Sequence, residues 1–222
     1  MLSSIAHRLV PAFGPLTVTT DARDGRGPGP GSIVAANHTS LFDPALVLAA
    51  LRRLGVEPVV LAAAGLWRIP GLGAALVREG YVPVHRRDPR AGNALTGARE
   101  ALRDGRVVLI YGEGGLPARV DSGEAAPERF RPGVARLARQ SGAPVVPLGQ
   151  AGARRVSSGS AGKQLAGLLT APVRRPALHV HVGAPVALTG DPIAAAEQAR
   201  RAVTDAWRTA VERLGGPVPP AG

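Results

Sequence analysis

The chain has no cysteine, a single lysine and only seven aromatic residues among its 222 positions. Without cysteine it can form no disulfide bond, no thiolate metal site and no cysteine acyl-enzyme. The scattered aromatic residues offer no stacking platform, and no basic helix or zinc-finger spacing is present, so nucleic acid is not an expected partner. There is no Gly-x-Ser-x-Gly elbow and no P-loop lysine, which disfavours serine hydrolases and P-loop NTPases.

Long apolar runs are also missing. The best candidates, 44–51 and 57–67, are well short of the roughly 18 residues that a membrane span requires. The first residues lack the long apolar core and cleavage pattern of a secretory signal. We therefore expect no transmembrane helix.

The first 14 residues nevertheless follow a helical pattern that places apolar side chains near one face. Such a helix either contacts a membrane interface or packs on its own domain, and the pattern favours neither. The apolar positions are Leu2, Ile5, Leu9 and Val10.

What the chain does have is positive charge, with 27 basic against 16 acidic residues and a net charge of +11. Such a protein attracts anionic lipid or phosphorylated substrates. With 45% hydrophobic residues it can bury a substantial core, most simply as a single domain over 1–222 with a flexible tail at 215–222. Paired arginines suggest a broadly positive surface; the pairs are 52–53, 86–87, 154–155, 174–175 and 200–201.

Apolar strand-like segments alternate with helical ones along the chain. The expected strands are 16–20, 32–37, 58–63, 81–85, 107–111, 143–149 and 177–183. The expected helices are 1–14, 44–54, 65–80, 91–105, 133–142 and 192–215. This alternation predicts an α/β fold with a mixed, mostly parallel sheet and helices on both faces. The irregular stretch 112–131 is long enough to suggest a functional loop.

The segment Asn-His-Thr-Ser-Leu-Phe-Asp-Pro, 37–44, carries the clearest chemical pattern. His38 would lie in the loop at a strand's carboxyl end, where open α/β sheets bind ligands. The Asp43 carboxylate can then fold back onto one imidazole nitrogen and leave the other free as a base. The alternative is local: Asp43 before Pro44 suits an N-cap, and Ser40 with Asp43 resembles a capping box.

Two other predicted strand ends carry polar features. Arg86, in His-Arg-Arg-Asp, has the donors to hold a phosphate, or it belongs to a solvated charge pair. In Gly-Glu-Gly-Gly-Leu-Pro, Gly114 and Gly115 let the backbone approach a ligand, with Glu113 as a polar contact or catalytic carboxylate. An ordinary glycine-rich turn is the alternative there.

Two further features have a structural interpretation. Pro147 is expected to end the strand at 143–149. His179 and His181 alternate onto one face of the last strand, but no acidic or cysteine partner is near them in sequence. A structural role is favoured for this pair, and no metal site is predicted.

Taken together and in order, several segments resemble the glycerolipid acyltransferase family, of the 1-acylglycerol-3-phosphate (lysophosphatidate) acyltransferase type. Residues 37–44 resemble its first block, with His and Asp separated by four residues. Residues 66–87 resemble the second block, and Tyr-Gly-Glu-Gly-Gly-Leu-Pro at 111–117 the third. Residues 143–152 resemble the fourth block, and Phe-Arg-Pro-Gly-Val-Ala-Arg-Leu-Ala at 130–138 is similar to the segment between the third and fourth. The resemblance covers about residues 32–190.

The resemblance implies a glycerol-3-phosphate acyltransferase-like fold and an O-acyltransferase that needs no cofactor. His38 would be the general base that activates an acceptor hydroxyl to attack the thioester of acyl-CoA or acyl carrier protein, with Asp43 orienting the ring. Arg86 would bind the phosphate of a lysophospholipid acceptor, and Glu113, Gly114 and Gly115 would shape the acceptor site. The implied enzyme is peripheral, on the cytoplasmic face of the cell membrane and on an anionic surface.

One departure from the family pattern affects the substrate. The third block normally continues Thr-Arg, where this chain has Gly115 and Leu116, so an expected phosphate-binding arginine is missing; Arg119 is a candidate substitute. Three alternatives stay open: an acyltransferase for another lipid alcohol, a hydrolase that uses the same His and Asp on water, and a non-catalytic basic membrane-binding domain.

Overall fold

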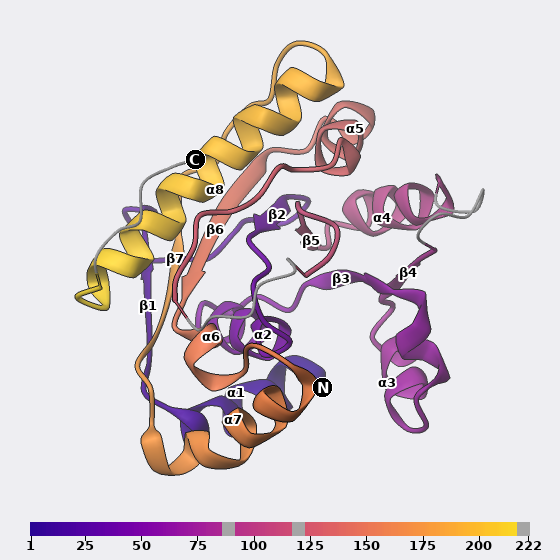
Figure 1. Ribbon diagram of the computed structural model, residues 1–222. Coiled ribbons are helices and arrows are strands. Elements are labelled where there is room, and N and C mark those ends of the chain that lie inside the picture. The colour runs from indigo at the N-terminus through magenta and orange to yellow at the C-terminus, as the bar shows by residue number, and fades with distance from the viewer. Residues whose placement is uncertain (86–91, 117–122, 217–222) are drawn as a thin grey trace.

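Seven strands form one sheet in the computed structural model, which describes residues 1–85, 92–116 and 123–216 (Figure 1). The strand order is β1-β7-β6-β2-β5-β3-β4, and every neighbouring pair is parallel except β6 with β7. The predicted α/β fold and mostly parallel sheet are therefore confirmed. The strands are β1 (Leu16–Thr20), β2 (Ile33–Ala36), β3 (Val59–Ala63), β4 (Val82–Val84), β5 (Val108–Tyr111), β6 (Val145–Ala151) and β7 (Leu178–Val182).

Helices cover both faces of this sheet, as predicted (Figure 1). One face packs against α1 (Leu2–Phe13), α2 (Asp43–Arg53) and α7 (Ala161–Arg174), and the other against α4 (Asn93–Arg103), α5 (Gly133–Ser141) and α8 (Pro192–Arg213). The remaining helical segments are η1 (Ala64–Arg68), α3 (Leu72–Arg78) and α6 (Ala153–Val156). Within the described ranges, no helix is both long and apolar enough to cross a membrane.

The central strand β2 explains why this sheet needs two helical layers. All four of its residues are fully buried, and they alternate between the two hydrophobic clusters. Val34 and Ala36 face the α2 side, whereas Ile33 and Ala35 face the α4 and α5 side. A strand that is apolar on both faces is stable only when both are covered.

The register of three neighbouring strands creates one shared edge. Ala36 of β2 pairs with Tyr111 of β5 on one side and with Leu148 of β6 on the other, all in parallel. Because parallel strands end on the same side, the residues that follow β2 and β5 meet there.

Four details differ from the expectations. The helix predicted over 65–80 is two segments, interrupted at Pro70 and at Gly71, which has a φ of 77°. Pro147 does not end its strand, because β6 continues to Ala151 and the Pro147 carbonyl accepts a hydrogen bond from Gly183. The helices α6 and α7 had no counterpart in the expectations. Arg154, assigned above to a positive surface, is buried.

The amino-terminal helix packs on its own domain, and it also keeps an exposed apolar side. Ser3, Ala6 and Val10 are buried, and α1 lies against α2. Ile5 and Leu9 are 45% and 56% exposed. The predicted apolar positions are thus divided between two faces of the helix. Most of the tail expected to be flexible, 217–222, lies outside the described residues.

Candidate active site

The His38 ring is held by a buried carboxylate. Its Nδ1 lies 3.0 Å from Oδ2 of Asp43, whose side chain has no solvent exposure, whereas the His38 side chain is 13% exposed. A carboxylate can only accept, so the proton of this bond belongs to Nδ1, and Nε2 keeps its lone pair. No residue in the described ranges bonds Nε2, which leaves it available as a base.

The same carboxylate oxygen also orders the loop around His38. Oδ2 of Asp43 accepts hydrogen bonds from the backbone N–H of Thr39 at 2.5 Å and of Ser40 at 2.9 Å. The contact with Ser40 resembles a capping box, but Asp43 is the first residue of α2 and Phe42 is its N-cap, so the N-cap interpretation of Asp43 is wrong. Three N–H donors, from His38, Thr39 and Ser40, thus converge on the Asp43 side chain at the start of α2.

The ring of Tyr111, the last residue of β5, stacks on the His38 ring. Their centroids are 4.4 Å apart with an interplanar angle of 29°. Burial, with a contribution from Asp43, raises the pKa of Tyr111 well above its usual range, so its phenol stays neutral. Tyr111 therefore acts as a flat support that limits rotation of the imidazole.

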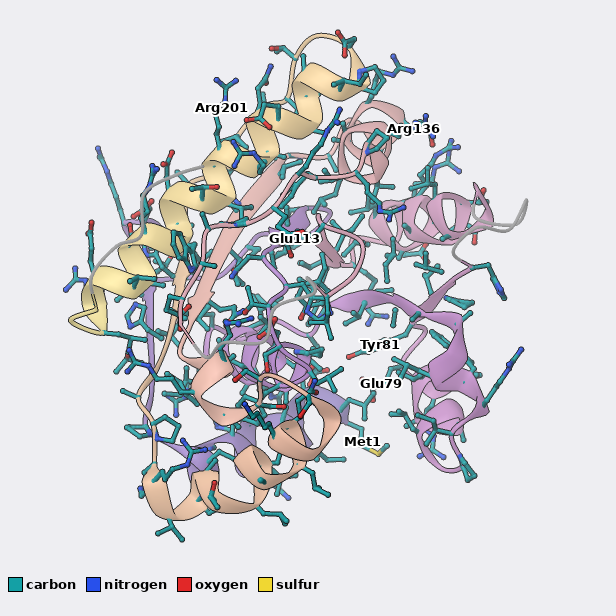
Figure 2. All side chains as sticks on the ribbon, in the orientation of Figure 1. Met1, Glu79, Tyr81, Glu113, Arg136 and Arg201 are labelled. Atoms are coloured by element: carbon teal, nitrogen blue, oxygen red, sulfur yellow. The ribbon has the colours of Figure 1, made fainter. Side chains whose placement is uncertain are left out.

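Glu113 connects the third block to the His38 loop. Its Oε2 accepts a 2.6 Å hydrogen bond from the His38 backbone N–H, and its Oε1 accepts a 3.0 Å bond from the Glu128 backbone N–H. Burial raises the pKa of Glu113 to about 8, although these two bonds act in the opposite direction. Figure 2 shows Glu113 near the centre of the molecule, between the helical layers.

Glycines 112 and 114 allow two side chains to pack onto the turn after β5. A Cβ on Gly112 would lie 2.3 Å from the Phe130 ring. A Cβ on Gly114, whose φ is 70°, would lie 2.6 Å from Cδ of Arg131. The glycines thus bring the guanidinium stem of Arg131 directly over the third block, and Gly115 beside them is partly exposed.

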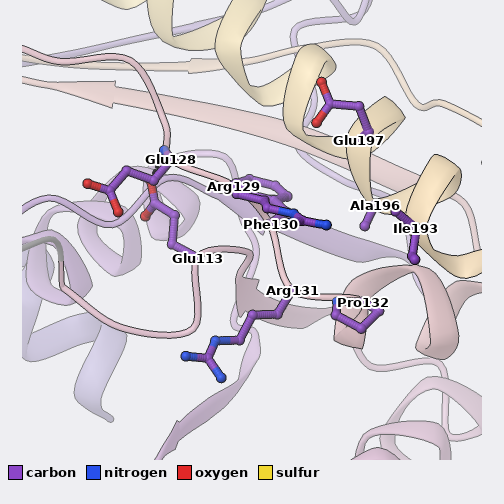
Figure 3. A pocket seen from close by; sticks show the side chains of 9 residues that line it. All are labelled: Glu113, Glu128, Arg129, Phe130, Arg131, Pro132, Ile193, Ala196 and Glu197. Carbon is purple, nitrogen blue, oxygen red and sulfur yellow. Dashed lines mark hydrogen bonds between the residues drawn. The ribbon is translucent and has the colours of Figure 1, made fainter. Parts of the chain in front are cut away.

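A cavity of about 610 Å³ adjoins this turn. Figure 3 shows Glu113 and Glu128 close together on one side, with the start of α8 across the opening. Its lining mixes charged and apolar groups: Glu113, Glu128, Arg129, Phe130, Arg131, Pro132, Ile193, Ala196 and Glu197. A cavity with two arginines and an apolar wall suits a ligand that carries both phosphate and hydrocarbon.

Four polar residues that the sequence analysis did not single out hold the His38 loop against β6. Asn37 pairs with the Gln150 backbone through two hydrogen bonds, of 3.1 Å and 2.9 Å. The Gln150 side chain donates to Oγ1 of Thr39 at 3.2 Å. Arg154, only 2% exposed, donates from Nη1 to the Thr39 carbonyl at 3.2 Å and from Nε to the Gly123 carbonyl at 2.7 Å.

A sequence signal existed for two of them. Asn37 directly follows a fully apolar strand, and Gln150 lies in a strand that is otherwise apolar, glycine or proline. Arg154 gave no such signal, because it stands next to Arg155 in the sequence and a pair of arginines is typical of a surface. In the structure only Arg155 is exposed. The predicted site residue Arg86 and the suggested substitute Arg119 lie outside the described residues.

The paired histidines of β7 are occupied by hydrogen bonds to β1. His179 contacts Oγ1 of Thr17 at 2.6 Å and of Thr19 at 3.0 Å. His181 contacts Thr19 at 2.9 Å and Asp21 at 3.4 Å. In the ranges that the structure describes, no group of three or more His, Asp or Glu side chains is arranged to hold a metal ion.

A buried carboxylate, an oriented imidazole and a glycine-rich turn beside a cavity meet at one edge of the sheet, an arrangement that can support general-base chemistry. The family model described as Acyltransferase matches residues 17–150, more than half of the chain. The chain therefore belongs to the acyltransferase family.

Two relatives extend this result. The chain is 31% identical over 117 residues to the 1-acyl-sn-glycerol-3-phosphate acyltransferase BAT2, chloroplastic, of Brassica napus; the match covers 52% of this chain and 31% of that protein. The crystal structure of the 1-acyl-sn-glycerophosphate (LPA) acyltransferase PlsC from Thermotoga maritima superposes with a TM-score of 0.68 at 20% identity. That match covers 97% of this chain and 79% of the other, and it shows a common fold.

Proposed function

We propose that this protein transfers a fatty acyl group from acyl-CoA or acyl carrier protein to the hydroxyl of a lysophospholipid such as 1-acylglycerol-3-phosphate. The observation that carries the proposal is the pairing of His38 Nδ1 with the buried Asp43, which orients the ring and leaves Nε2 without a bond to any described residue. The names of the two relatives support the choice of substrate class.

In the proposed reaction, Nε2 of His38 removes the proton from the acceptor hydroxyl. The oxygen attacks the thioester carbonyl carbon, and a C–O bond forms. When the tetrahedral intermediate collapses, the C–S bond breaks and the imidazolium returns its proton to the departing thiolate. Asp43 stabilises the imidazolium between these two steps, and no acyl-enzyme is needed.

Arg131 is the proposed source of the phosphate-binding charge that the third block lacks at Gly115 and Leu116. Its stem lies over Gly114, and it lines the cavity next to Glu113. Guanidinium binds phosphate through paired donors, so one arginine so placed can orient a lysophospholipid head group. Arg86 keeps the same role as a proposal from the sequence.

The test is an acyl-transfer assay with radiolabelled acyl-CoA or acyl carrier protein and a panel of lysophospholipids and other lipid alcohols. We expect ester formation with a phosphate-bearing acceptor and a loss of about 10²–10⁴-fold in kcat for His38→Ala, as removal of a general base predicts. The matched control is His7→Ala, on α1.

Three results would contradict the proposal. Full transfer by a folded His38→Ala variant would exclude the base. Release of free fatty acid at the same rate with and without acceptor would make the protein a hydrolase. Binding to liposomes without transfer to any acceptor would make it a membrane-binding module.

A further inference from the structure

The outward face of α7 is apolar along its whole length. Leu165, Leu169 and Val173 are 59%, 72% and 86% exposed, and their spacing of four places them in one stripe. The inward face is provided by Leu168 and Ala171, which pack on the core. A contiguous exposed apolar stripe on such a helix is typical of an interaction surface.

The exposed side of α1 continues this surface. The two helices contact one another and lie together at one end of the molecule (Figure 1). Ile5 and Leu9 are exposed on α1, one helical turn apart. We call the exposed apolar positions of both helices, with their basic neighbours, the α1/α7 face; the apolar positions are Ile5, Leu9, Leu165, Leu169 and Val173.

The two helices of the α1/α7 face contribute only positive side-chain charge. No Asp or Glu occurs in residues 1–20 or between Arg129 and Gly190, the two stretches that contain these helices. Arg8, Lys163, Arg174 and Arg175 are exposed around the apolar stripes, and none of them forms an ion pair within the described part of the chain. An apolar stripe with a basic border is the pattern of a helix that lies in a membrane interface.

The same face adjoins the loop that carries His38. Phe13, the last residue of α1, contacts Phe42 with ring centroids 5.1 Å apart. Ser40 donates a 2.6 Å hydrogen bond to the carbonyl of Ser157, in the segment that leads into α7. Between them, the Leu41 side chain is 61% exposed. A layer that covers both helices would therefore also reach the loop that carries His38.

We propose that the α1/α7 face docks on an anionic lipid bilayer, with α7 as a principal contact, and that this docking presents the His38 loop to membrane-embedded acceptors. The second half of this proposal rests on the acyltransferase function proposed above. Charge decides the occupant: a second copy placed symmetrically on this face would bring eight cations together without a carboxylate, whereas anionic lipid neutralises them.

The experiment is flotation of the full chain with vesicles of phosphatidylcholine alone or mixed with phosphatidylglycerol. We expect binding to the anionic vesicles, weakened by salt. The pair Leu165→Asn with Leu169→Asn should lower the partition coefficient by about tenfold. Leu169→Asn alone should bind less well than Val77→Asn, a control because Val77 is 67% exposed on α3, outside the α1/α7 face and the cavity lining.

Unchanged binding by the double variant, or a loss in Val77→Asn equal to that in Leu169→Asn, would overturn the docking face. A wild-type dimer that becomes a monomer in the double variant would assign the face to a second copy instead. Transfer to a water-soluble short-chain acceptor should persist in the double variant while transfer to a vesicle-embedded one falls. If the wild type transfers no acyl group but the variants still differ in vesicle binding as expected, the proposed enzyme activity would be overturned and the docking face would remain supported.

Discussion

The carboxyl group of Glu113 holds the backbone of His38, 75 positions away in sequence, through a 2.6 Å hydrogen bond. The bond joins the turns after β5 and β2, which are neighbours in the sheet. Glu113 was predicted to contact the substrate; the geometry adds a positioning role, because the bond fixes the loop from which the imidazole projects.

The pH dependence of stability should report the burial of Glu113. Its pKa is about 8 in the folded protein and near 4.5 when unfolded, so the folded state prefers the protonated form. Its contribution to stability is present below pH 4.5 and is lost as the pH rises towards 8. Glu113→Gln should be less stable than wild type at pH 5, because the single amide oxygen can accept only one of the two backbone hydrogen bonds that the carboxyl group accepts. The deficit should shrink by pH 9.

Chemical denaturation at pH 5, 7 and 9 measures this difference. Glu100→Gln is the control, since it makes the same substitution at an exposed position on α4. A deficit that stays constant over this range would mean that Glu113 does not titrate as its burial implies.

Arg131→Ala should raise the KM for a phosphate-bearing acceptor while kcat changes less. Loss of a charged hydrogen bond to phosphate corresponds to about 1.5–3 kcal/mol, which is roughly 10- to 150-fold in affinity. Arg136→Ala, an exposed arginine on α5, controls for the loss of one positive charge. Equal KM values for the two variants would remove Arg131 from the acceptor site.

Arg154→Met should destabilise the protein and loosen the His38 loop. The substitution leaves the buried Thr39 carbonyl without this donor, at a cost of about 1–3 kcal/mol. Arg155→Met removes the same charge from an exposed neighbour and should change stability by less than about 0.5 kcal/mol. Thermal unfolding of both variants distinguishes the loss of a buried hydrogen-bond donor from the loss of one positive charge. Equal melting temperatures would refute the structural role of Arg154.

Acid should weaken the contact between β1 and β7. Burial, aided by His181 and Arg213, lowers the pKa of His179 from 6.5 to about 4. The unfolded chain binds this proton first, so the stability contributed by neutral His179 is complete above pH 6.5 and is lost as the pH falls towards 4. Between pH 6.5 and pH 4, the unfolding free energy of His179→Asn should fall less steeply with decreasing pH than that of the wild type. The difference in slope should be up to about 1.4 kcal/mol per pH unit. Parallel curves for the two proteins would contradict this.

Much of the fold was predictable because its signals are local. Each of the seven strands overlaps a segment whose apolar run or alternation was visible in the sequence, and Pro83 lies in β4, an edge strand, where proline is tolerated. The helices α6 and α7 were not predicted, because α6 is a single turn of four residues and α7 contains Gly167 and Pro172, which disfavour a helix interior.

The site was predictable only in part. Histidine and aspartate five positions apart indicated their own hydrogen bond, because a short loop brings them together. The contacts of Glu113 with His38 and of Arg154 with Thr39 join residues 75 and 115 positions apart. Such contacts exist only once neighbouring strands are in register, and no local pattern encodes them.

The sequence by itself determined the alternation of strands and helices, the pairing of His38 with Asp43 and the excess of positive charge, since each depends on composition or on neighbours along the chain. The tertiary structure alone decided that Arg154 is buried while Arg155 is exposed. It also decided that Glu113 supports the His38 backbone and that α1 and α7 share one basic, apolar face. The reason is that burial and long-range contact depend on which strands and helices become neighbours in space.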